Sequence, residues 1–140
     1  MFNKRETQTS GALVVRFTHH EETDIHELTF LESSRRSAEQ GLAYVTQIFE
    51  AATNESRLRL LLDMRQSGLL PFNSVITAGR EWTRRVKVHP TTRMVLLVRQ
   101  DAALSLLQPI FSFMRFGHLK LHIFQGDRHA EAVAWLLKEG

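Results

Sequence analysis

The sequence predicts a single α/β domain with the element order ββαβαβαβα and a mixed sheet with helices packed against it. Two apolar runs, 58–64 and 94–98, have the length and composition of buried strands. The stretch between them carries apolar residues at helical spacing, and a strand–helix–strand unit requires parallel pairing with a right-handed crossover. A short polar connection between two earlier strands suits an antiparallel hairpin instead. We therefore expect both kinds of pairing in one sheet.

The domain is expected to follow a polar tail, residues 1–10, so we assign residues 11–140 to it. Residues 12–18 predict a first strand, and residues 25–31, in which apolar and polar residues alternate, predict a second. The six residues between these strands are all polar. A connection of this kind predicts an antiparallel hairpin.

The hairpin holds three histidines, His19, His20 and His26, together with three carboxylates within the same eight residues. Such groups can bind a metal ion. Adjacent residues of a strand point to opposite faces, however, and no recognised ligand spacing is present. We therefore predict a solvated hairpin and no metal site.

A first helix is predicted from Ser37 to Ala52. Ser37 is followed three residues later by Gln40, which matches the capping box and predicts Ser37 as the N-cap. Gly41 inside this helix costs about 1 kcal/mol relative to alanine, which favours a close approach of the helix to a strand. The residues expected to face the sheet recur at helical spacing. They are Leu42, Val45, Phe49 and Ala52.

The run 58–64 is predicted as the central strand of the sheet. Asp63 lies at its carboxyl end, which is where open α/β sheets place their functional groups. Residues 65–71 follow as a loop with a Ser-Gly turn signal. Asn73 is the predicted N-cap of the next helix, with Ser74 in its first turn.

Two faces are predicted for this second helix. The face toward the core comprises Val75, Gly79, Trp82 and Val86. The opposite stripe is basic and comprises Arg80, Arg84 and Lys87. A stripe of this kind is typical of a solvated helix, and it also suits the docking of an acidic partner. The sequence leaves both interpretations open.

After a strand at 91–99, the segment 104–116 is apolar on more than one side, and Pro109 within it predicts a kink. One interpretation is a helix wedged between the sheet and a neighbouring helix. The other is an apolar surface for a small molecule, a lipid or a membrane. The residues of that surface would be Leu106, Ile110, Phe111, Phe113 and Phe116.

The chain is predicted to end with a strand at 119–124, at an edge of the sheet, and a last helix with Asp127 as its N-cap. Trp135 is expected on the flank of this helix. Its apolar face is predicted from helical spacing. It comprises Ala130, Val133, Ala134 and Leu137.

The composition excludes several kinds of functional site. The absence of cysteine excludes disulfides, thiolate metal sites and thiol nucleophiles, and favours a cytoplasmic setting. No export signal or membrane-spanning run is visible. The net charge is +3, and 14 of the 18 basic residues are arginine, which suits carboxylate or phosphate partners. A net charge of this size is also usual for a soluble protein without such a partner. We do not expect nucleic-acid binding.

The chain also lacks the motifs that carry common chemistries. No glycine-rich phosphate loop occurs, and Gln66-Ser67-Gly68 lacks the first glycine of a nucleophile elbow. The histidines His89, His118 and His122 lie near predicted element ends, but no nucleophile can be placed beside them. We therefore predict no catalytic residue and no cofactor, and we expect a protein that is not an enzyme.

The element order and four short stretches together resemble SpoIIAA-like proteins of the STAS superfamily. The stretches are Leu60–Met64, Met94–Val98, the strand end Ile123–Asp127, and the helix sequence Glu131–Leu136. The last two are the most specific, because a strand that ends in Phe is followed by a short acidic turn and a Glu-Ala-x-Ala-Trp-Leu helix. The resemblance covers the chain from Ala12 onward.

The resemblance implies a non-catalytic regulatory domain that binds another protein, as anti-sigma factor antagonists do. Those proteins are switched by a serine kinase that phosphorylates the start of the helix after the central strand, which corresponds here to Ser74, with Ser67 second. A second copy of the chain is a further candidate partner. The partner surface would comprise Asp63, Arg65, Asn73, Arg80, Arg84 and Lys87. Likeness to lipid-carrying CRAL-TRIO domains gives the 104–116 segment its alternative use in binding an apolar ligand or membrane.

Overall fold

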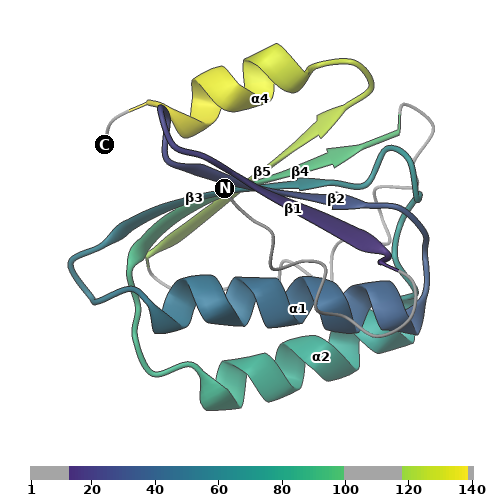
Figure 1. The fold of residues 1–140 in the computed structure, drawn as a ribbon, viewed down its shortest axis with the longest axis horizontal. Coiled ribbons are helices and arrows are strands. Elements are labelled where there is room, and N and C mark those ends of the chain that lie inside the picture. The colour runs from purple at the N-terminus through teal and green to yellow at the C-terminus, as the bar shows by residue number, and fades with distance from the viewer. Residues whose placement is uncertain (1–12, 100–117, 139–140) are drawn as a thin grey trace.

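The computed structural model describes residues 13–99 and 118–138, and Figure 1 shows their arrangement. Each strand and helix predicted within these ranges is present. The tail 1–10 and the apolar segment 104–116, with Leu106, Ile110, Phe111, Phe113 and Phe116, lie outside the described residues. The elements are β1 (Val15–His20), β2 (Ile25–Phe30), α1 (Arg35–Glu50), β3 (Arg57–Asp63), α2 (Phe72–Arg85), β4 (Thr91–Val98), β5 (Leu119–Gln125) and α4 (His129–Leu136).

The five strands form one mixed sheet in the order β1-β2-β3-β4-β5. β1 and β2 pair antiparallel, and the remaining neighbours pair parallel. This confirms the predicted α/β class and mixed pairing. β3 is the central strand, as predicted, because Leu60 pairs with His26 on one side and with Met94 on the other. Among the described strands β5 lies at an edge, also as predicted.

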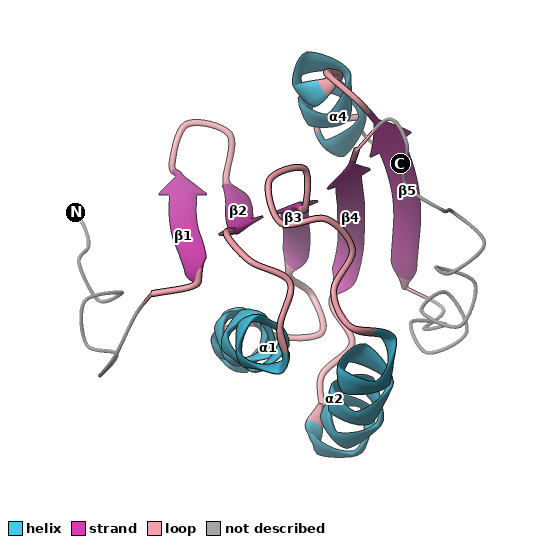
Figure 2. Ribbon diagram, turned by 90° about the vertical axis from the view of Figure 1, so that its right-hand side faces the viewer, coloured by secondary structure: helices cyan, strands magenta, loops and turns pink. Residues whose placement is uncertain are grey.

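Helices cover both faces of the sheet: α1 and α2 lie on one side and α4 on the other (Figures 1 and 2). Successive residues of a strand point to opposite faces. Leu60 and Leu62 of β3 therefore pack toward α1 and α2, whereas Leu61 packs toward α4. Because both faces are covered, β3 and β4 read as continuous apolar runs rather than alternating ones.

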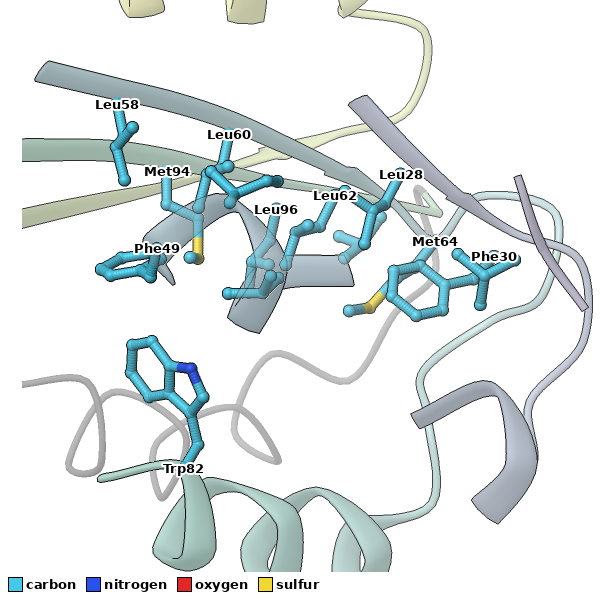
Figure 3. Close-up of a cluster of buried hydrophobic side chains, with 14 of the residues drawn as sticks. Leu28, Phe30, Phe49, Leu58, Leu60, Leu62, Met64, Trp82, Met94 and Leu96 are labelled. Atoms are coloured by element: carbon cyan, nitrogen blue, oxygen red, sulfur yellow. The ribbon is translucent and has the colours of Figure 1, made fainter. Parts of the chain in front are cut away.

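The larger core lies under α1 and α2, where Trp82 of α2 projects toward Phe49 of α1 (Figure 3). The two rings meet edge to face with their centroids 5.0 Å apart, and Trp82 is only 5% exposed. An aromatic pair of this geometry adds about 0.5–1.5 kcal/mol to the hydrophobic gain from burial. Trp82 thus fixes the C-terminal half of α2 against α1, which confirms its predicted place on the core face.

The smaller core lies under α4, where Ala132 and Leu136 are fully buried. The prediction for this helix was wrong: Leu137, placed on the apolar face, is 39% exposed. The eight residues of α4 are apolar on nearly every side, so their spacing does not define one face. Two arginines of the sheet set its orientation instead. Arg59 donates to the carbonyl of Leu136, and Arg93 to that of Trp135, each at 3.1 Å.

The three described helices begin at residues other than those predicted. Ser34 is the N-cap of α1, and Ser37 is the third helical residue, whose hydroxyl accepts from the Ser34 amide at 3.1 Å. The capping box is therefore present, but three residues earlier. Pro71 precedes α2 with a φ of −59°, which preorganises the helical turn, so Asn73 lies inside the helix. Arg128, not Asp127, is the N-cap of α4.

Candidate functional site

An open groove runs between α1 and α2 on the side facing away from the sheet. Both helices connect neighbouring parallel strands in the same sense, so they lie side by side with their N-terminal ends together (Figure 2). The groove has a volume of about 770 Å³. Its walls are lined from α1 by Arg35, Glu39, Leu42, Ala43, Thr46 and Glu50, and from α2 by Asn73, Ser74, Thr77, Ala78, Glu81 and Arg85.

The groove is shaped by short side chains and edged by charged ones. Ala43 of α1 and Ala78 of α2 both line it, and their short side chains leave the space between the helices unfilled. Arg35 and Glu39 form an ion pair at 3.0 Å on the α1 side. Glu81 and Arg85 supply one charge of each sign on the α2 side. The charged edges therefore suit a polar protein surface better than a small apolar ligand.

Ser74, the first predicted phosphorylation site, lines this groove in the first turn of α2. Ser67, the second, lies in the loop before the helix, and its hydroxyl donates to the carbonyl of Gly68 at 2.7 Å. Pro71 provides no side-chain hydrogen bond to cap the helix. The backbone amides of the first turn are thus available to an anion attached to a first-turn residue such as Ser74.

The predicted basic stripe lies next to the groove. Asn73, Arg80 and Arg84 are all exposed, and their spacing places them on one side of α2, beside the residues that line the groove. Lys87 does not belong to the helical stripe, because α2 ends at Arg85 and Val86 is its extended C-cap. It lies instead in a neighbouring hollow with Val86 and Val88, which shares Thr46, Glu50 and Arg85 with the groove. Four of the six predicted surface residues are therefore close to the groove.

The other two, Asp63 and Arg65, face the opposite side of the sheet. Arg65 binds the Asp63 carboxylate through two guanidinium nitrogens, at 3.0 and 2.9 Å, and through its backbone amide at 3.0 Å. Asp63 is only 7% exposed. The hydrogen bond to Asp63 is the main reason that the pKa of Arg65 is raised. Asp63 therefore serves the structure of the loop and offers no surface to a partner.

Sequence reasoning missed Arg99, which closes the loop between β3 and α2. Its guanidinium donates to the carbonyls of Arg65 and Gln66, each at 2.9 Å. Gly68 turns the chain with a φ of +81°, and a Cβ atom there would lie 3.3 Å from Nη1 of Arg99. Parallel strands end at the same edge of a sheet, so the residue after β4 could have been expected beside the loop after β3.

A second group that sequence reasoning did not assemble lies on the β1–β2 hairpin. His19 and His26 are directly opposed across the two strands, and their rings stack with centroids 4.2 Å apart. The Asp24 carboxylate lies 2.8 Å from Nε2 of His19 and 3.9 Å from Nε2 of His26. Burial, helped by His19, lowers the pKa of His26 to about 4, although Asp24 acts in the opposite direction.

His20, the neighbour of His19, points to the other face of the sheet. There its Nε2 lies 2.8 Å from the Glu27 carboxylate, which also lies 3.5 Å from Nε2 of His129. The prediction that adjacent histidines of the strand point to opposite faces is therefore correct. His19 therefore lies beside His26 of the opposite strand, and not beside His20 of its own strand.

None of the helices in the described ranges is long and apolar enough to cross a membrane. Comparison with protein-family models, with curated proteins and with solved structures finds no match for this chain.

Proposed function

We propose that this protein is a non-catalytic regulatory domain, similar in role to the anti-sigma factor antagonists, which binds another protein through α2. The supporting observation is that Arg80 and Arg84 are exposed on one side of α2, directly beside the groove that Ser74 lines. A basic ridge beside a groove suits a partner that presents acidic side chains. A cytoplasmic setting is part of this proposal.

Ser74 is the proposed switch of this surface, and an anti-sigma-type serine kinase is the proposed modifying partner. A phosphate on Ser74 would add close to two negative charges to a groove that already holds Glu39 and Glu81. An acidic partner would then meet repulsion at one end of the surface. Ser67 is less suited to this role because its hydroxyl is bonded within its own closed loop. Phosphorylation is therefore expected to release the partner.

The experiment uses a photo-crosslinking amino acid placed at Arg80 in the full chain, expressed in its source cells. The same crosslinker at Ala134, which is exposed on α4 at the other face of the sheet, is the control position. A protein that crosslinks from position 80 and not from 134 is then purified and its binding is measured with both proteins isolated. Binding that Ser74→Glu weakens and Ser74→Ala preserves would support the proposal.

Two outcomes would overturn it. The first is equal crosslinking from positions 80 and 134, which would show no preference for the α2 surface. The second is a captured protein whose affinity, measured with purified components, is unchanged by Ser74→Glu and by reversing the charge of Arg80. Far-UV circular dichroism of each variant establishes that the fold is retained.

A further inference from the structure

Among the described residues, a cluster of possible metal ligands that the proposed function does not use lies at the end of the β1–β2 hairpin. Three possible metal-ligand atoms lie within 4.8 Å of one another, one each from His19, Asp24 and His26. Zinc binds imidazole nitrogen at about 2.0–2.1 Å and carboxylate oxygen at about 2.0–2.2 Å, so its ligands sit a little over 3 Å apart. The separations from Asp24, 2.8 and 3.9 Å, bracket that value.

We propose that His19, Asp24 and His26 form a binding site for a divalent transition-metal ion, of which zinc is the representative. This site is independent of the proposed partner surface, because it lies on the hairpin and not on α1 or α2. Three protein ligands leave at least one coordination position for water. Both His19 and Asp24 are exposed, so an ion can reach them from solvent.

The fold brings the three ligands close together before any ion binds. The antiparallel register of β1 and β2 places His19 opposite His26, and the two rings are nearly parallel, 5° apart. The ring of His26 also stacks on Phe17, which in turn stacks on Tyr44 of α1. Asp24 has a left-handed backbone, with a φ of +57°, which turns its carboxylate back toward the histidines. A metal ion lies in the plane of each imidazole that binds it, so the two stacked rings cannot both bind one ion without a change in ring orientation. Binding therefore requires the exposed ring of His19 to rotate, while the strand register can stay as it is.

The ligand set determines which ions fit. Two imidazole nitrogens and one carboxylate favour zinc and its neighbours in the first transition row, whereas calcium and magnesium prefer oxygen ligands. The other ring nitrogen of His26, Nδ1, is buried and has no hydrogen-bond partner. Metal-bound histidines normally donate from that nitrogen, and losing such a bond weakens binding by about 10–100-fold. We therefore expect an affinity well below that of structural zinc sites with a complete second shell.

Binding would join the two strands of the hairpin next to their turn. β1 is an edge strand that pairs only with β2 among the described residues, so a bridging ion would reduce fraying at this corner of the sheet. The ion would bind the folded chain in preference to the unfolded one, since the three ligands converge only in the hairpin. It would therefore raise the thermal stability, and the gain would grow with the logarithm of the free ion concentration above Kd.

The test is isothermal titration calorimetry of zinc chloride into the full-length chain near neutral pH, with stability followed by thermal melting. The variants are His19→Gln and Asp24→Asn; asparagine tolerates the left-handed backbone at position 24. The matched control is His20→Gln, which removes the adjacent histidine on the other face of the sheet. Cobalt absorption spectra of the same proteins report the coordination directly.

We expect one zinc ion per chain, a higher melting temperature with zinc, and a loss of affinity of at least about tenfold in His19→Gln and Asp24→Asn. His20→Gln should bind as the unmodified chain does. The proposal would be overturned by the absence of saturable zinc binding, or by equal losses in all three variants. Binding that His20→Gln removes and His19→Gln leaves intact would assign the ion to the other face, and would also overturn it.

Discussion

Gly41 of α1 lies directly against the ring of Phe30 of β2: a Cβ atom at position 41 would lie 2.7 Å from Cε2 of that ring. This confirms the expectation, drawn from a glycine inside a predicted helix, that the helix approaches a strand closely at this point. Phe30 is only 3% exposed and belongs to the larger core. The contact therefore sets the distance between α1 and the sheet.

Gly41→Ala should destabilise the protein. Overpacking of a buried site costs about 1–3 kcal/mol, while alanine regains up to about 1 kcal/mol of helix propensity. We expect a net loss of about 1–2 kcal/mol in the free energy of unfolding, measured by urea denaturation. Phe30→Leu supplies the control. If the contact is responsible, the double variant should be less destabilised than the two single losses added together, and simple additivity would contradict the explanation.

Arg99→Ala should loosen the loop between β3 and α2 without unfolding the domain. The variant removes two hydrogen bonds to the carbonyls of Arg65 and Gln66. Because Arg99 is exposed, we expect a loss of only about 0.5–1 kcal/mol in global stability. Hydrogen exchange followed by mass spectrometry should show faster exchange in residues 65–71 and unchanged exchange in β3. Unchanged exchange in the loop would mean that Arg99 does not hold it.

Asp63→Asn should be more damaging than Asp127→Asn, although Arg65 is close to both carboxylates. Asp63 is almost completely buried and holds Arg65 through paired hydrogen bonds, whereas Asp127 is fully exposed and 3.6 Å away. Breaking a buried charged pair leaves unsatisfied groups and costs about 1–3 kcal/mol. Asp127→Asn should leave the urea midpoint unchanged. Equal effects of the two substitutions would show that burial does not decide the strength of these pairs.

The stability of the metal-free protein should fall as the pH is lowered from 6.5 toward 4. In this range His26 takes up a proton in the unfolded chain, but its pKa of about 4 keeps it neutral in the folded one. The unfolded state then binds more protons, so acid favours unfolding. Replacing His26 with Phe should flatten the dependence of the urea midpoint on pH in the presence of a chelator. An unchanged slope would show that other groups cause the pH dependence.

Much of the fold could be predicted because the signals are local and repeated. Leu58 to Met64 and Met94 to Val98 are long enough, and apolar enough, to be recognised as covered strands, and the crossover rule then sets their direction. Helix starts were predicted less well, since several polar residues compete for each cap. Ser34 and Ser37, for example, are separated by a single turn, and only the packing of Ser37 in the interior decides between them.

The candidate sites depend on pairings that are distant in sequence. Ser74 and Arg80 could be placed on one helix, but the groove beside them exists only because α1 lies parallel to α2. The contact of Arg99 with Arg65 spans 34 residues and follows from strand order. The spacing along a single strand did not predict that His19 and His26 would lie together. The register of the hairpin places them opposite each other.

The most direct test of the proposed function is the affinity of the isolated partner for three forms of the chain. These are the unmodified protein, Arg80→Glu/Arg84→Glu, and the control Arg16→Glu/Arg57→Glu, which changes the net charge equally at exposed positions away from α2. We expect the α2 variant to bind at least about tenfold more weakly, as loss of complementary charge predicts, and the control to bind normally. Equal weakening by both variants, or none by either, would contradict a partner surface on α2.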